Sequence, residues 1–205
     1  MKFDPAIESK REMYFRMIEC IVPRPIAWVG SGSRTGVFNL APYSFFTGVS
    51  SSPPTLLFCA GNRRGGALKD SVKNIIETEE FTVNIVSKPQ VEAMVQTSGE
   101  YPPEISEFHA AGLTPVGSDL VSAPRVDGAP ISFECTLHDL VELADDGGRV
   151  NARIVIGRIR LLHIADELLD NAGRVDPTRL SPVARIGGQD YAELGQVFTI
   201  KRPTV

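Results

Sequence analysis

Residues 24–71 have the sequence RPIAWVGSGSRTGVFNLAPYSFFTGVSSSPPTLLFCAGNRRGGALKDS, and this stretch decides the fold. Ile26–Val29 is a short apolar run, residues 30–36 form a glycine-rich turn, and a second run returns from Val37. Two such runs around a turn are typical of a β-hairpin with a longer loop. Thr55–Ala60 predicts a further buried strand. The stretch therefore indicates strands that follow one another without intervening helices.

Later segments continue this pattern with one helix between strands. Apolar residues between Leu68 and Ile76 share one helix face, whereas those of Phe81–Ile85 alternate with polar residues as in a strand. Residues 131–138 alternate in the same way, and residues 150–156 follow after a glycine turn. The parity of the apolar residues changes at Gly157, which predicts a β-bulge.

The remaining segments complete the expected architecture. Ser9 is expected to cap a helix that ends near Ile18, and Lys88–Ser98 predicts another helix. Residues 99–130 are rich in Gly and Pro and predict a long excursion with little regular structure, and Val197–Lys201 predicts a last strand. Strands outnumber helices without regular alternation, so we expect a mainly β, antiparallel barrel with peripheral helices, formed by residues 1–205 as a single domain.

Composition excludes several classes of function. The chain has 205 residues, 42% of them hydrophobic, and a net charge of -4. Nucleic acid is not expected as a partner, because phosphate contacts need an excess of basic residues. No apolar run is long enough to span a bilayer, and the first residues lack the apolar core of a signal peptide, so we expect no membrane association and a cytoplasmic location.

No familiar catalytic or metal motif is present. The three cysteines are far apart, which argues against a disulfide framework or a zinc ribbon, and the three histidines are isolated, so no metal site is predicted. The chain has no G-x-S-x-G nucleophile elbow. No catalytic residue can be assigned from the sequence.

A basic cluster next to a helix start is the strongest chemical signal. Residues 61–66 read GNRRGG, and a helix is expected to begin near Ala67. The free N–H groups of a helix start attract anions, and Arg63, Arg64, Lys69 and the Ser71 hydroxyl could complete an oxyanion cage. A phosphate-bearing cofactor is the natural candidate. A glycine turn with solvated basic residues is the alternative interpretation.

Residues 39–46, NLAPYSFF, form a second unusual segment. Pro42 is expected to break the strand and to leave backbone groups outside the ladder, where they would suit the edge of a flat heteroaromatic ligand. The alternative is a strand end with core aromatic residues. Trp28 could likewise be a core residue or border such a ring, and Cys59 is expected to be an inert core thiol.

Taken together, these motifs resemble the flavin reductase-like, FMN-binding split-barrel family. The resemblance rests on RPIAWVG, NLAPYSFF, KDS and EFTVNIV in the first half of the chain and on VARIGGQDY near its end. It implies a six-stranded antiparallel Greek-key split barrel, a homodimer, FMN as cofactor, and NADH or NADPH as a donor of electrons.

The resemblance also implies which residues bind the cofactor. Residues near the ring would be Trp28, Asn39, Ala41, Pro42, Tyr43, Ser44, Phe45, Cys59, Ala60 and Gly61. Residues toward the ribityl chain and phosphate would be Ser50, Ser52, Arg64, Lys69, Asp70 and Ser71, with Arg185 reaching the site from the same or the other subunit.

Two departures from the family pattern bear on function. The usual K-D-T is K-D-S here, and Gly-Gly-Arg-Val stands at the Gly147 turn where many reductases of the family carry an Asp-His pair. The leading hypothesis is an FMN-dependent oxidoreductase that acts on a small redox substrate or with a partner redox enzyme. An FMN-binding electron carrier that does not oxidise NAD(P)H itself and a non-enzymatic ligand-binding barrel are the alternatives.

Overall fold

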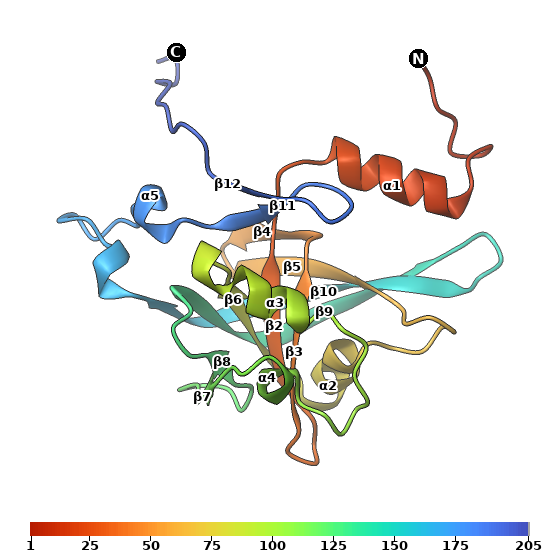
Figure 1. The fold of residues 1–205 in the computed structure, drawn as a ribbon, viewed down its shortest axis with the longest axis horizontal. Coiled ribbons are helices and arrows are strands. Elements are labelled where there is room, and N and C mark those ends of the chain that lie inside the picture. Colours follow the sequence, from red (N-terminus) through yellow and green to blue (C-terminus); the bar gives the residue numbers. More distant parts are fainter. Residues whose placement is uncertain (205) are drawn as a thin grey trace.

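The computed structural model describes residues 1–204 and shows a mainly β protein with short peripheral helices (Figure 1). Its strands are β1 (Arg24–Pro25), β2 (Ala27–Gly32), β3 (Phe38–Tyr43), β4 (Phe46–Ser51), β5 (Pro54–Gly61), β6 (Glu80–Ile85), β7 (Pro115–Val116), β8 (Arg125–Val126), β9 (Ile131–Ala144), β10 (Val150–Ile164), β11 (Val183–Arg185) and β12 (Tyr191–Glu193). Its helices are α1 (Lys10–Cys20), α2 (Asp70–Thr78), α3 (Val91–Gln96), α4 (Glu107–Ala110) and α5 (Pro177–Leu180), with 3-10 turns η1 (Lys88–Gln90) and η2 (Asp166–Leu168). No helix within this range is long and apolar enough to cross a membrane.

The main sheet closes on itself at one place, which we call the seam. The sheet is antiparallel, and its strand order is β3-β2-β6-β9-β10-β5-β4. Strands β3 and β4 lie at opposite ends of this order, yet only Ser44 and Phe45 separate them in the chain. Two residues cannot span an open sheet, because an extended residue reaches only ~3.5 Å. The sheet must therefore curl until its two edges meet, which gives the predicted split barrel.

Two expectations about this region are corrected. The barrel sheet has seven strands rather than six. Pro42 does not break a strand but lies within β3, opposite Trp28 of β2. Strand β3 is an edge strand, so the missing N–H of the proline costs no ladder hydrogen bond on the outer side. The chain instead leaves the ladder at Ser44 and Phe45.

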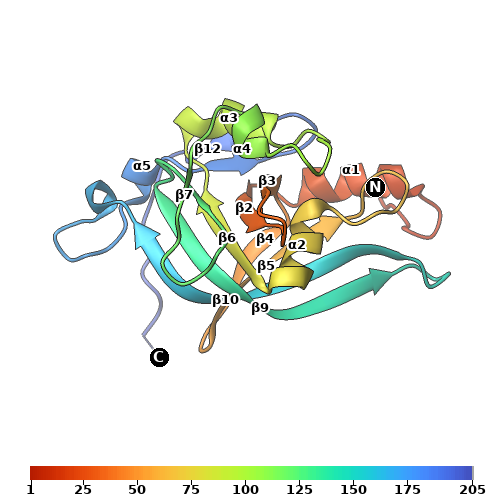
Figure 2. The same ribbon diagram turned by 90° about the horizontal axis from the view of Figure 1, so that it is seen from below.

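Strands β9 and β10 form the longest hairpin and carry the predicted bulge. The register between them shifts between Ile156 and Gly157 and again between Ile159 and Leu161. The Cβ of any other residue at Gly157 would lie 2.3 Å from Cζ of Phe81, so only glycine lets the bulged strand approach the barrel interior. The far end of the hairpin extends beyond the barrel (Figure 2).

The helices begin and end where local chemistry allows. Ser9 caps α1 through a capping box with Glu12, as the sequence predicts. Helix α2 begins at Asp70 rather than near Ala67, because the glycines at 65 and 66 have positive φ and keep the chain irregular until Lys69. The helix predicted over residues 88–98 is η1 followed by α3.

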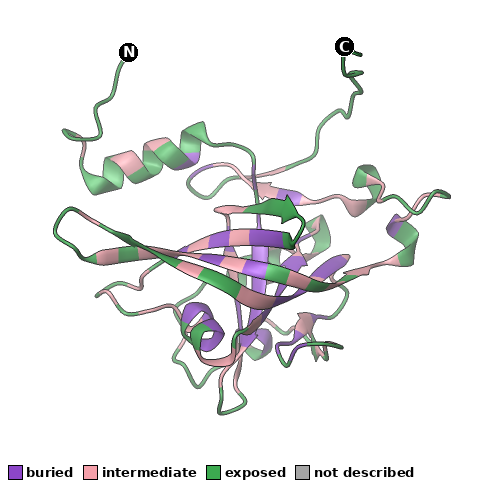
Figure 3. Ribbon diagram, turned by 180° about the vertical axis from the view of Figure 1, so that it is seen from behind, coloured by how far each residue is buried: buried purple, intermediate pink, exposed green. Residues whose placement is uncertain are grey.

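Two cores share strand β2. Ala27 and Val29 face the barrel interior, whereas Trp28 and Ile26, the residue just before β2, face a second core under α3 and α4. Alternation along a strand with both faces covered produces this pattern. Figure 2 shows α3 and α4 beside β2 and β3, and Figure 3 shows that burial concentrates in the middle of the barrel, whereas α1 is largely exposed.

The segments outside the barrel partly follow expectation. Residues 99–130 hold only α4, β7 and β8, which agrees with the predicted excursion. The last predicted strand is wrong: residues 197–201 have no regular structure, and the tail instead forms β11, which pairs with β1, and β12, which pairs with β11. Figure 1 shows this small sheet above the barrel, next to α1.

Candidate functional site

A cavity of about 440 Å³ opens beside the seam, a volume in the range of small-molecule sites. The predicted site residues that line it are Asn39, Ala41, Pro42, Tyr43, Ser44, Phe45, Cys59, Gly61, Lys69, Asp70 and Ser71. Strand β3, the break at the seam, the end of β5 and the start of α2 supply these residues. Segments that are separate in the sequence thus form one wall, which we call the seam cavity.

The backbone of the break lies at this wall. Cys59 N–H donates to the Phe45 carbonyl at 2.8 Å, which fastens the break to β5. The N–H groups of Ser44 and Phe45, in contrast, donate to no residue within 1–204. Because native backbone donors are almost always paired, with protein, water or ligand, two such donors beside a cavity are available to a bound molecule.

A buried network of polar side chains forms the floor of the seam cavity. Tyr43 Oη and Ser71 Oγ lie 3.1 Å apart, and Ser71 Oγ donates to Asn39 Oδ1 at 2.6 Å. Asn39 Nδ2 donates to Glu107 Oε1 at 2.7 Å, and Leu40 N–H donates to Glu107 Oε2 at 3.0 Å. Every member of the network is buried. The amide of Asn39 therefore has one fixed orientation, set by Glu107 on one side and Ser71 on the other.

Burial alters the acidity of groups in this network. Burial raises the pKa of Glu107, although the hydrogen bonds from Leu40 and Asn39 oppose the shift. Burial raises the pKa of Tyr43 to about 12, so this phenol stays protonated and donates its hydrogen bond at neutral pH. Burial also raises the pKa of Cys59, which agrees with an unreactive thiol.

Charged groups surround the mouth of the seam cavity. Arg63 pairs with Asp70, and Lys69 lies 3.8 Å from the exposed Glu100. The Nε atom of Arg63 is buried and has no hydrogen-bond partner within the described residues. A buried guanidinium N–H without an acceptor is unfavourable. Because Arg63 also lines the cavity, an anionic group bound there would lie next to this guanidinium.

Other predicted residues lie elsewhere. Trp28 belongs to the second core, where Nε1 donates to Thr97 Oγ1 at 2.9 Å, so it does not border the cavity. Ala60 points into the barrel core, because alternation along β5 places only its neighbours Cys59 and Gly61 at the wall. Ser50, Ser52 and Arg64 are exposed and are not part of the wall. Arg185 lines a neighbouring cavity.

Several wall residues escaped prediction. They are Tyr14, Ile18, Asn62, Thr97, Ser98, Gly99, Glu100, Glu107 and Ala152. Only Asn62 belongs to a motif visible in the sequence, where its neighbour Arg63, which also lines the wall, was already expected to contact an anion. Glu107 comes from the excursion expected to be irregular, and it reaches Asn39 across 68 positions. A signal existed, because an acidic residue in the first turn of a short helix that also carries Phe108 is a candidate for burial with a partner.

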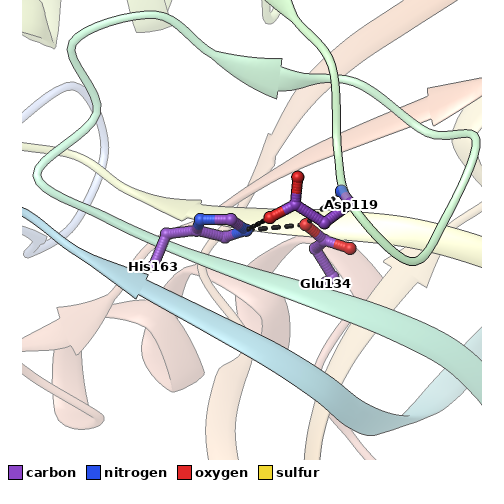
Figure 4. Close-up of side chains that lie close together, drawn as sticks. All are labelled: Asp119, Glu134 and His163. Carbon is purple, nitrogen blue, oxygen red and sulfur yellow. Dashed lines mark hydrogen bonds and ion pairs between the residues drawn. The ribbon is translucent and has the colours of Figure 1, made fainter.

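A second buried carboxylate lies outside the seam cavity. Glu134 of β9 accepts hydrogen bonds from Asp119 N–H at 2.8 Å and Leu120 N–H at 2.6 Å, and His163 Nε2 lies 2.6 Å from its Oε1 (Figure 4). His163 looked isolated in the sequence, but β10 places it next to β9. Both oxygens of Glu134 are already used, so the cluster fastens the 117–124 loop to the barrel.

Removing this carboxylate should destabilise the protein. Glu134→Gln turns an amide N–H₂ toward one of the two backbone donors, and we expect a loss of about 2–3 kcal/mol in the free energy of unfolding at pH 7. Burial opposes ionisation, but the bonds from Asp119, His163 and Leu120 together lower the pKa of Glu134. The stabilisation is therefore complete above the unfolded value of ~4.3 and is lost as pH falls below it.

Urea unfolding of both proteins at pH 7 and below pH 4 measures this difference. Glu142→Gln is the matched control, because Glu142 lies on the same strand and is itself exposed, although it pairs with Arg153, and the substitution should change stability by less than ~1 kcal/mol. Equal losses in the two variants would contradict the role given to Glu134.

Comparison with known proteins identifies the family. The family model described as a flavin reductase like domain matches residues 19–179, so the chain belongs to this family. A relative from Aquifex aeolicus, itself without an assigned function, is 40% identical over 88% of this chain and 89% of its own length.

Two solved structures have the same fold throughout. The nitrilotriacetate monooxygenase component B from Bacillus cereus is 34% identical, with a TM-score of 0.93 over 98% of both chains. The 2-nitrobenzoate 2-nitroreductase NbaA from Pseudomonas fluorescens is 30% identical, with a TM-score of 0.87 over 100% of this chain and 97% of that one. The chain thus shares the flavin reductase-like family, and its whole fold, with proteins named as a monooxygenase component and a nitroreductase.

Proposed function

We propose that the seam cavity binds FMN and that the protein is an FMN-dependent oxidoreductase of the flavin reductase type. This proposal depends on two sets of hydrogen-bond donors in the wall residues that have no acceptor in the described part of the protein. The N–H groups of Ser44 and Phe45 lack acceptors at one part of the cavity, and the buried Nε of Arg63 lacks one at another. A flat ring with acceptors at its edge, linked to an anion, would satisfy both sets.

The residues present fit such a cofactor. Residues 41–45 would hold the ring with backbone groups, while Cys59 and Gly61 line the same cavity from β5. Arg63, Lys69 and the start of α2 would hold the phosphate, since a helix N-terminus favours an anion. The bound flavin would supply the electron-transfer chemistry. The fixed amide of Asn39 and the protonated Tyr43 keep the floor of the site polar and rigid without acting as acid or base.

The proposal also covers the electron donor and the electron acceptor. We infer that NADH or NADPH reduces the flavin, as the family suggests. The likeness to a monooxygenase component B favours delivery of electrons to a partner redox enzyme, and the likeness to a nitroreductase favours direct reduction of a small organic substrate. A homodimer stays a prediction; the exposed Tyr14, Phe15 and Met17 on α1 favour it.

A pair of adjacent arginines tests the cofactor site. Arg63 lines the seam cavity, whereas Arg64 is exposed outside it. A hydrogen bond to a charged group contributes about 1.5–3 kcal/mol, so Arg63→Gln should weaken FMN binding by about 10- to 150-fold. Arg64→Gln should change it less than about threefold. Titration of the apoprotein with FMN, followed by flavin fluorescence and absorbance, gives both dissociation constants.

The same samples test the reaction. Rapid bleaching of bound FMN by NADH or NADPH in a stopped-flow instrument supports the reductase, whereas slow bleaching by both leaves the electron carrier. Failure of the unmodified protein to bind FMN would overturn the cofactor proposal. A larger effect of Arg64→Gln than of Arg63→Gln would show that the phosphate lies nearer Arg64, as the family resemblance implies.

A further inference from the structure

A second cavity of about 210 Å³ adjoins the seam cavity. The two cavities share five wall residues, which are Tyr14, Ile18, Pro42, Ser44 and Ser98. The second cavity is formed by α1, β1, β3, α3 and the tail strands β11 and β12. We call it the arginine cavity, because Arg24 and Arg185 both line it.

The two arginines face each other across a strand pair. Arg24 of β1 and Arg185 of β11 are direct partners in the antiparallel register. Like charges directly opposite each other on neighbouring strands are destabilising. Neither guanidinium lies within ion-pair distance of a carboxylate in the part of the chain that the structure describes. This cavity thus contains two positive charges and no negative one.

Both side chains are nevertheless held firmly in place. Arg24 is only 3% exposed, and its Nη1 donates to the carbonyls of Ile18 and Ile21. Its guanidinium lies 5.9 Å from the ring of Phe45, and that of Arg185 lies 4.5 Å from the ring of Tyr191. Carbonyls and aromatic faces position these charges but do not neutralise them.

Electrostatics favour an anion between them. Burial lowers the pKa of Arg24, and the charge of Arg185 lowers it further. In the seam cavity, by contrast, Arg63 and Lys69 each have an acidic neighbour. The Nη2 of Arg24 has no hydrogen-bond partner among residues 1–204. The Nη1 and Nη2 groups of Arg185 already donate to Tyr191 Oη and the Gly188 carbonyl. A carboxylate or phosphate group here would therefore be held by the free Nη2 of Arg24 and by the charges of both guanidinium groups.

We propose that the arginine cavity binds the oxyanion group of the second substrate, whose reacting part then lies in the seam cavity beside the flavin. This inference rests on the proposed function, since it takes the ring site as given. The shared wall at Pro42 and Ser44 places the two groups next to each other. The anion belongs either to the phosphates of a nicotinamide dinucleotide or to a carboxylate on a small electron acceptor.

Calorimetry on the FMN-loaded protein tests the proposal with matched probes. Benzoate represents a small carboxylate, benzamide is its neutral counterpart, and NAD⁺ represents the dinucleotide. We expect at least one of the anionic probes to bind, and Arg185→Gln to weaken that binding by about 10-fold or more. Arg185→Lys keeps the charge and should recover part of the loss. Arg160→Gln, an exposed arginine of β10, is the control and should bind as the unmodified protein does.

Each outcome decides between defined alternatives. Loss of benzoate binding alone assigns the site to a carboxylate acceptor, and loss of NAD⁺ binding alone assigns it to the dinucleotide. Benzamide binding equal to that of benzoate, or anion binding unaffected by Arg185→Gln, would overturn the proposal. If Arg185→Gln weakens FMN itself instead, the arginine cavity holds the cofactor phosphate and this inference fails, while the proposed function stands.

Discussion

Asn39→Asp should destabilise the protein by about 3–5 kcal/mol at pH 7. Asn39 Nδ2 lies 2.7 Å from Glu107 Oε1, and both residues are buried, so the substitution places two carboxylates in contact. Two carboxyl groups at this distance cannot both ionise, so one pKa of the pair rises strongly. For a chain of this size the melting temperature should fall by ~10 °C.

The raised pKa of the carboxyl pair also sets how the stability of the variant changes with pH. The folded variant retains a proton that the unfolded chain releases above ~pH 4, so its stability should fall as pH rises from about 4 toward neutrality. Thermal melts between pH 4 and pH 8 measure the change. The unmodified protein should show a smaller effect of the same direction, because the pKa of Glu107 is already raised by burial.

A double substitution provides the control. In Asn39→Asp combined with Glu107→Gln, the glutamine amide can donate to the new carboxylate while its oxygen accepts the Leu40 N–H. More than half of the lost stability should return at pH 7 if the contact between the two side chains is the cause. Additive losses from the two substitutions would show that the residues do not interact.

Gly157→Ala should have the second large effect, a loss of about 3 kcal/mol in the free energy of unfolding. The new Cβ would lie 2.3 Å from Cζ of Phe81 and 3.3 Å from Cβ of Cys135. Phe81 is fully buried and cannot swing away into solvent. Its ring packs edge-on against Phe58, which packs against Tyr43 at 4.8 Å between ring centroids. A shift of Phe81 is therefore transmitted to the floor of the seam cavity.

Chemical denaturation and an FMN titration of the same variant measure both consequences. Gly48→Ala is the matched control, because Gly48 also lies in a barrel strand but a Cβ there meets nothing within 4 Å. The control should change stability by less than ~0.5 kcal/mol. Unchanged stability of Gly157→Ala would mean that the bulge can shift without strain.

The sequence predicted those parts of the fold that depend on local pattern. The alternation of apolar and polar residues predicted β6, β9 and β10, and the change of parity at Gly157 predicted the bulge. The capping residue Ser9 predicted the start of α1. The errors at Pro42 and in the tail have a common physical origin. Whether a proline is tolerated depends on which edge of a strand is paired, and whether a short tail segment becomes a strand depends on a partner such as β1.

The candidate site could be predicted where several residues of one short sequence motif line the same cavity. Asn39, residues 41–45 and residues 69–71 line one cavity. Alternation explains why Ala60 does not line it although its neighbours Cys59 and Gly61 do, and why Trp28 faces the second core instead. Glu107 could not be paired with Asn39 in advance, because nothing local indicates where an irregular excursion returns to the barrel.

The link between Asn39 and Glu107 also orders events during folding. It joins residues 68 positions apart, and such distant contacts form late because the intervening loop must first close. The hairpin that carries Asn39 can form early from local contacts alone. We therefore expect the polar floor of the seam cavity to be complete only after the excursion has docked, so that the proposed cofactor site forms at the end of folding.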